Sequence, residues 1–171
     1  NAEGAVFPGA AAMTSGDDVA NHRLVTRAVH EAGGTIFVQL MHTGRVGHPD
    51  NMPGGARLLA PSAVTAAGEM WTDGAGNQPH PEPEEMSPAD IQQAIAEFVD
   101  ASRRAIEAGF DGVELHAGHG FLLSQFLSPL FNRRTDDHGG SIEARSRLLL
   151  AVVREVRSEE LGALRAAIYG G

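Results

Sequence analysis

The chain has 171 residues, enough to bury a core, and its 42% hydrophobic and 20% charged content is ordinary for a globular protein. The formal net charge of -9 argues against general nucleic-acid binding, which needs a basic surface. Cysteine and lysine are both absent from the sequence, which excludes disulfides, thiolate nucleophiles, Cys-based metal sites, Schiff-base lysines and P-loop lysines.

Redox chemistry in a chain without cysteine must come from an added cofactor. No apolar run approaches the ~18 residues that span a bilayer, and no basic segment followed by an apolar one marks a secretory signal. We therefore expect no membrane partner, no nucleic-acid partner and a cytoplasmic location. Because the sequence begins with Asn1, we also expect residues before it.

The first quarter of the chain predicts a loop, a helix and a strand. Residues 1–16 are rich in glycine and alanine and lack a period, so they predict a loop. Asp17 or Asp18 then caps a helix that runs to about residue 32. Residues 35–41 are β-branched and aromatic between glycines, which predicts a strand. Their nearly continuous apolar character predicts burial on both faces.

The next segment, residues 43–86, is rich in glycine and proline and shows no clear period. A loop of this length in a compact domain is usually functional or disordered, and we expect a short hairpin inside it near residues 60–64. Ser87 then fits an N-cap, with Pro88 at the first helical position and an acidic side chain at the third. This start predicts a helix that continues to residue 109.

The second strand is predicted at residues 110–115, and His116 follows at its end. After a polar loop, Ser141 caps a further amphipathic helix. Strands that alternate with longer helices predict βαβ units, a parallel sheet and an α/β fold. We expect residues 1–171 to form one domain. Its tail, residues 158–171, carries only a weak strand signal at residues 164–169.

Polar residues stand at the ends of both predicted strands, where parallel α/β folds bind their ligands. One end carries Gln39-x-x-His42 and the other carries His116-x-x-His119. Two neutral imidazoles side by side can donate two hydrogen bonds to one oxygen atom and stabilise negative charge that develops there. The Gln39 amide can bond the edge of a flavin ring or a similar heterocycle.

Other interpretations of these residues stay open. Two histidines at this spacing also occur by chance as surface or cap residues, and Gln39 could be a satisfied core amide. A metal site could draw on His42, His116, His119 and His138, but no H-E-x-x-H helix and no carboxylate at ligand spacing accompanies them. The polar cluster at residues 132–137 predicts a solvated loop with an internal Arg–Asp network rather than an anion clamp.

Three sequence motifs resemble the old yellow enzyme family of FMN-dependent ene reductases. The first is FVQLMHTGRVGHP at residues 37–49, followed by APSA at residues 60–63. The second is GFDGVELHAGHGFLL at residues 109–123. The third is QFLSP at residues 125–129, with NRRTD at 132–136 and GGS at 139–141. The resemblance extends from the first residues to about Arg157.

The resemblance implies a (β/α)8 TIM barrel, of which this chain would supply about the third and fourth strands with their flanking helices. It also implies FMN at the barrel top, NADH or NADPH as reductant, and hydride transfer to activated alkenes such as enones, maleimides and nitroalkenes. By similarity Gln39 contacts the flavin pyrimidine ring, and His116 and His119 bind the substrate oxygen. Residues 43–86 resemble the loop on the substrate side.

This sequence departs from the family pattern in three respects. Phe121 stands where most members have the tyrosine that donates a proton, so water or another group would have to protonate the product. Ala144 replaces a common asparagine. A closed barrel needs ~250 residues, so this chain alone does not close it, and the resemblance places the FMN phosphate site beyond this sequence.

Three hypotheses follow for the function of the chain. The first is an NAD(P)H-dependent flavin oxidoreductase, of which this chain is part. The second is a non-catalytic half-barrel that binds no flavin and covers its open sheet edges by forming a homo-oligomer or by pairing with a complementing barrel segment. The third, a metal-dependent hydrolase that uses the histidines, has the least support from the residues.

Overall fold

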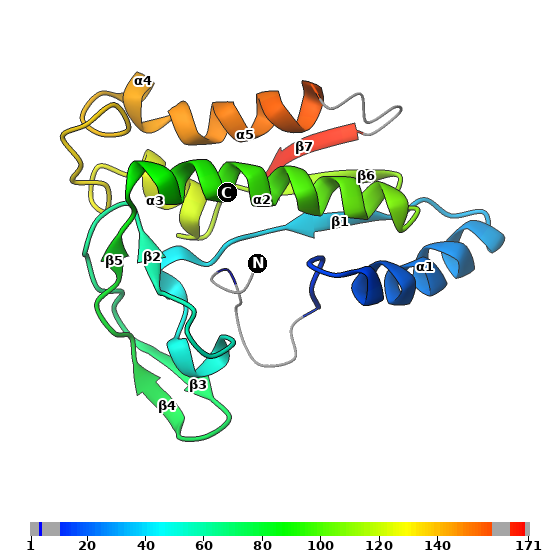
Figure 1. Cartoon of the computed structure of the whole chain (residues 1–171), viewed down its shortest axis with the longest axis horizontal. Helices are drawn as coiled ribbons and strands as arrows, with labels where there is room; N and C mark the ends of the chain where they lie inside the picture. Colours follow the sequence, from blue (N-terminus) through cyan, green and yellow to red (C-terminus); the bar gives the residue numbers. More distant parts are fainter. Residues whose placement is uncertain (1–3, 5–10, 159–164, 170–171) are drawn as a thin grey trace.

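A parallel three-stranded sheet with helices on one face forms the body of the protein (Figure 1). The computed structural model describes residue 4, residues 11–158 and residues 165–169. The helices are α1 (Gly16–Glu31), α2 (Pro88–Glu107), α3 (Leu122–Leu127), α4 (Ile142–Arg145) and α5 (Arg147–Ser158), with 3-10 turns η2 (Gly44–Val46) and η3 (Pro49–Asn51). The strands are β1 (Phe37–Leu40), β2 (Leu59–Ala60), β3 (Glu69–Thr72), β4 (Gly76–Pro79), β5 (Glu84–Glu85), β6 (Gly112–His116) and β7 (Arg165–Tyr169).

The strands of the three-stranded sheet lie in the order β1-β6-β7, and both pairings are parallel. The predicted α/β class and parallel sheet are therefore confirmed. The weak signal at residues 164–169 corresponds to a strand, β7, which pairs directly with β6 along its whole length. Residues 159–164 and 170–171 of the predicted tail lie outside the described residues.

The hydrophobic core lies between the sheet and helices α2 and α5, which pack against each other over one face of it (Figure 1). Val113 and Leu115 of β6 are fully buried on that face, and Leu40 of β1 joins them. The opposite face is open within the described part of the chain. Phe37 is 44% exposed there, so the prediction that both faces of the first strand are buried is wrong for this face.

Helix α1 starts slightly earlier than the sequence predicted. Its N-cap is Ser15, whose hydroxyl accepts from the Asp18 N–H, while the Asp18 carboxylate accepts from the Ser15 N–H. Asp18 is therefore the third residue of a capping box and not the cap. Helix α2 starts as predicted, because Ser87 and Asp90 form the same reciprocal pair with Pro88 between them.

Residues 43–86 have more structure than the predicted loop. Strands β2 and β5 pair in parallel and bring residues 59–60 beside residues 84–85, whereas β3 and β4 form an antiparallel hairpin. The expected hairpin near residues 60–64 is thus wrong in position, since the hairpin spans residues 69–79. Helix α3 was not predicted. Ser141 caps a helix as expected, but the single helix predicted after it is divided into α4 and α5 at Ser146.

No helix in the described ranges combines the length and apolar character that a membrane crossing requires.

Candidate functional site

The carboxyl ends of β1 and β6 bring the predicted site residues to one edge of the sheet. Gln39 lies opposite Glu114 in the parallel register, and both side chains are on the open face, since Leu40 and Leu115 point into the core. The Gln39 amide nitrogen donates to Glu114 Oε1 at 2.9 Å. Gln39 is exposed, so the interpretation as a satisfied core amide is wrong, and its amide is accessible to a ligand.

His116 and His119 form a close pair at the end of β6. The rings are stacked, with centroids 5.1 Å apart and planes at 21°. His119 Nδ1 and His116 Nε2 are hydrogen-bonded to each other at 3.3 Å, so that one ring donates and the other accepts. A ligand oxygen that replaced this bond could be reached by both nitrogens, so the spacing predicted from the sequence corresponds to a close pair in space.

The loop after β6 holds this pair in position. His119 has a φ of +53°, in the left-handed region that non-glycine residues rarely adopt, and Gly120 continues with +73°. This conformation turns the chain so that Phe121 begins helix α3 and its ring lies 5.1 Å from the His116 ring. Phe121, at the expected proton-donor position, therefore borders the histidine pair.

Burial lowers the pKa of His116, and the neighbouring His119 lowers it further, while Glu114 opposes both effects. A lowered pKa keeps the imidazole neutral near neutral pH. A neutral imidazole has one N–H, so His116 can donate a hydrogen bond to an oxygen without carrying charge into the site. This is the protonation state that the predicted oxygen-binding role requires.

A buried amide that sequence reasoning missed joins the two strand-end loops. Gln125 of α3 donates to the carbonyl oxygens of Thr43 at 2.9 Å and Gly120 at 2.6 Å, and it accepts from the Arg45 N–H at 3.1 Å. Gly44, at φ +60°, leaves room for it, since a Cβ there would lie 2.2 Å from Gln125 Oε1. The amide thereby fixes the position of the loop that carries His119.

His42 has a structural role and does not join the histidine pair. Its Nδ1 accepts from the Gly44 N–H at 3.1 Å, and its carbonyl accepts from the Leu122 N–H at 2.9 Å. Burial lowers the pKa of His42 to about 3, so the ring is neutral. No three His, Asp or Glu side chains gather as a metal site in the part of the chain that the structure describes.

The polar cluster at residues 132–137 contains the predicted Arg–Asp network, but its central residue is not solvated. Arg134 is buried, pairs with Asp136, and donates to the carbonyl oxygens of Pro61 at 3.0 Å and Met86 at 2.7 Å. This guanidinium lowers the pKa of Asp136 to about 2. The backbone carbonyls that follow β2 and β5 accept hydrogen bonds from Arg134 and so offset the cost of burying its guanidinium group.

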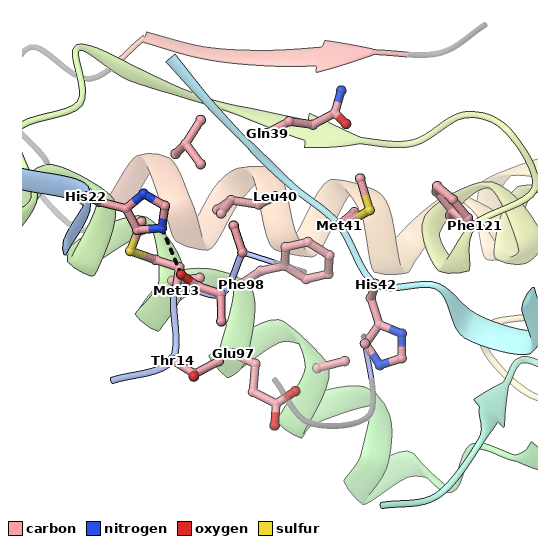
Figure 2. A pocket seen from close by; sticks show the side chains of 16 residues that line it. Met13, Thr14, His22, Gln39, Leu40, Met41, His42, Glu97, Phe98 and Phe121 are labelled. Atoms are coloured by element: carbon pink, nitrogen blue, oxygen red, sulfur yellow. Dashed lines mark hydrogen bonds between the residues drawn. The ribbon is translucent and has the colours of Figure 1, made fainter. Parts of the chain in front are cut away.

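A cavity of about 490 Å³ lies beside the open edge of β1 (Figure 2). Figure 2 shows Met13, His22, Phe98 and Glu97 on one side of β1, with Gln39 on the side toward β6. Gln39 and Phe121 of the candidate site line this cavity, but His116 and His119 do not. The cavity therefore adjoins the candidate functional site, whose polar groups lie at the strand ends.

Comparison with known proteins gives a consistent result. The sequence profile of the NADH:flavin oxidoreductase / NADH oxidase family matches residues 1–168. The flavin oxidoreductase hxnT of Emericella nidulans is 42% identical over 97% of this chain, and a probable flavin mononucleotide-dependent alkene reductase of Leishmania infantum is 42% identical over 82% of it. The match reaches past Arg157 and includes residues 165–168 of β7, so the resemblance extends further than the motifs alone indicated.

Two solved structures share the fold. An old yellow enzyme homologue from Zymomonas mobilis superposes on 99% of this chain with a TM-score of 0.93 at 35% identity, and a morphinone reductase superposes on 98% with 0.90 at 34%. The sheet and helices described above are thus part of a TIM barrel, as expected. The chain spans 42% of the Emericella protein and 47% of the Zymomonas one. The chain belongs to the NADH:flavin oxidoreductase / NADH oxidase family.

Proposed function

We propose that this chain forms the substrate side of an FMN-dependent reductase that takes electrons from NADH or NADPH and reduces activated alkenes such as enones, maleimides and nitroalkenes. The observation that carries this proposal is the convergence of His116 Nε2 and His119 Nδ1, 3.3 Å apart, at the sheet end where the Gln39 amide is exposed. The family membership and the reductase names of the relatives support it.

The residues present fit the flavin that the family implies. The exposed amide of Gln39 has both a hydrogen-bond donor and an acceptor, which suits the pyrimidine edge of a flavin ring. Gln39 is exposed near the carboxyl end of β1, which is the end of the strands where TIM barrels bind their ligands. FMN, when bound, would supply the hydride.

The histidine pair would bind and polarise the substrate oxygen. When a substrate oxygen replaces the His116–His119 hydrogen bond, a neutral His116 would donate from Nε2 and His119 from Nδ1 to that carbonyl or nitro oxygen. Such bonds strengthen as negative charge develops on that oxygen, which favours the transition state over the ground state. Phe121 beside them carries no proton, so the final proton would come from water or from another group.

Flavin binding is the first test. The full native polypeptide, mixed with FMN, is expected to quench the flavin fluorescence, to give a yellow protein, and to lose that colour when NADPH is added without oxygen. A later addition of cyclohexenone should restore the colour. A protein that never quenches FMN fluorescence would instead support the non-catalytic half-barrel. Composition and the lack of an apolar span in the sequence favour a cytoplasmic location for this activity.

The roles of the histidines need a separate measurement. We expect His116→Ala to weaken the binding of a phenol, monitored by its charge-transfer band with the flavin, by about 10- to 100-fold, because a hydrogen bond to a phenolate is charge-assisted. FMN affinity should change less than about threefold. His30→Ala, at the opposite end of the sheet beside Asp111, is the control. Equal losses of phenol and FMN affinity would contradict the assignment.

A further inference from the structure

The Gln39–Glu114 pair bears on which ligand edge the site accepts. The two residues are register partners on adjacent strands, and the Gln39 amide nitrogen lies 2.9 Å from Glu114 Oε1. Glu114 is half-buried, two residues before His116 on the same strand face. Its carboxylate is therefore held close to the histidine pair and to the exposed amide at once.

The charge of Glu114 decides which way the Gln39 amide faces. An ionised carboxylate only accepts hydrogen bonds, whereas an amide has a donating NH₂ end and an accepting oxygen end. The NH₂ end of Gln39 must therefore face Glu114, since the reverse orientation would place two acceptors in contact. As a result, Gln39 Oε1 points away from Glu114, together with the second N–H of the same amide.

We propose that Glu114 is a positioning residue that locks the Gln39 amide so that the site selects a ligand edge with adjacent N–H and C=O groups, that is, an imide. Gln39 Oε1 accepts from the ligand N–H, and the remaining N–H of Gln39 donates to the ligand C=O. The proposal rests on the proposed function, because the pyrimidine ring of FMN carries such an imide edge. It adds a residue and a selection rule to that function.

A purely structural role for Glu114 makes a different prediction. If Glu114 only supported the sheet or the loop after β6, its replacement would weaken every flavin equally. If it orients the amide, its replacement would weaken only ligands that donate from the imide nitrogen. The ratio of two flavin affinities therefore separates the two roles, without reference to catalytic activity.

The probes are FMN and N3-methyl-FMN, which lacks the imide hydrogen, and binding is followed by flavin fluorescence in the full native polypeptide. The variants form a graded series at one position. Glu114→Gln keeps the size of the side chain but allows both amide orientations at Gln39. Glu114→Lys places a donor against Gln39 and favours the reversed orientation. Glu155→Gln, an exposed carboxylate on α5, is the matched control.

We expect the native protein to prefer FMN over N3-methyl-FMN by about tenfold, as for one lost hydrogen bond in a desolvated site. The preference should fall about two- to fivefold in Glu114→Gln and should nearly vanish in Glu114→Lys, whereas Glu155→Gln should match the native protein. In a Gln39→Met background the Glu114 variants should no longer change the ratio, because the residue acts through Gln39.

Failure of this inference and failure of the proposed function give different results. A protein that binds FMN, but whose preference is the same with Glu, Gln or Lys at position 114, would overturn the role of Glu114 and leave the proposed function standing. A protein that binds neither flavin would overturn the proposed function and the inference with it. A change in preference that persists in the Gln39→Met background would show that Glu114 acts by another route and would also overturn the inference.

Discussion

At the scale of single residues, Phe121 is the position where the chemistry of this chain differs most clearly from the family pattern, which has a tyrosine there. Its ring lies 5.1 Å from the His116 ring at an angle of 59°, beside the convergent nitrogens. It also serves as the N-cap residue of α3 without a side-chain cap bond, so its backbone role does not depend on the ring substituent. A hydroxyl added to this ring would put a proton donor beside the histidine pair.

We therefore expect Phe121→Tyr to speed the re-oxidation of reduced flavin by enones by about 100-fold, the lower end of the usual contribution of one general acid. Rapid-mixing measurements of flavin absorbance, with NADPH and enone in separate steps, would show the change. The reductive step with NADPH should stay within about twofold, because it needs no proton from residue 121. An unchanged enone rate would indicate that another group already donates the proton.

The residues that hold the site were harder to predict than the residues that form it. His116, His119 and Gln39 stood out because polar side chains at the ends of apolar strands are unusual. Gln125 and Arg134 did not stand out, because their partners are backbone carbonyls from segments about 50 to 80 residues away along the chain. No local pattern in a single sequence marks which backbone groups will converge on a buried amide or guanidinium.

At the scale of secondary structure elements, the start of α2 is stabilised by a carboxylate whose pKa is strongly lowered. Asp90 accepts from Arg57 at 2.6 Å, which is the largest cause, and from the Ser87 hydroxyl at 2.6 Å, and its pKa is lowered to about 2. The unfolded value is about 4. The stabilisation is thus complete above pH ~4 and is lost as the pH falls toward ~2.

We expect Asp90→Asn to lower the free energy of unfolding by about 1 kcal/mol at pH 7, typical of a lost cap with a partly exposed ion pair. The difference from the native protein should shrink as the pH falls from ~4 to ~2, because the native carboxyl becomes protonated. Urea unfolding followed by circular dichroism at several pH values measures it. Asp73→Asn, in the exposed hairpin turn, is the control, and a pH-independent difference would contradict the cap role.

The long elements were predicted well, and the short ones were not. Helix α2 has a strong cap and a sustained period of buried apolar residues, so its limits came from the sequence within two residues. The two-residue strands β2 and β5 are too short to show a period, and they form only because they pair with each other. Strand β7 gave a weak signal for a related reason, since its stability comes from pairing with β6.

At the scale of the whole molecule, the open face and edge of the sheet are the surfaces most prone to association with another chain. In the described residues β1 pairs only with β6, so its other edge carries unpaired backbone groups beside the apolar cavity. Phe37, at the start of β1, is 44% exposed on the open face. Unpaired edges next to apolar surface promote association between chains.

We predict that the 171-residue chain, produced by itself, self-associates, and that Phe37→Lys shifts it toward the monomer, because a charge at a strand edge opposes pairing. Sedimentation velocity over a concentration series would measure the distribution. Leu24→Lys on α1 is the control, since Leu24 is 69% exposed but belongs to a helix, whose backbone groups are not available for strand pairing. A chain that is monomeric at every concentration would contradict the prediction.

The hydrogen bonds of Gln125 also limit where this protein can be joined to a relative in a chimera. Every contact described for the histidine pair and its loop, including the Gln125 bonds and the bond from Leu122 to His42, begins and ends within residues 37–125. This stretch can therefore be exchanged as one block, because a chimera that keeps it intact keeps each donor with its own acceptor. A crossover between residues 45 and 120 would take the two loops from different parent proteins. The donors and acceptors of these hydrogen bonds would then no longer come from the same sequence.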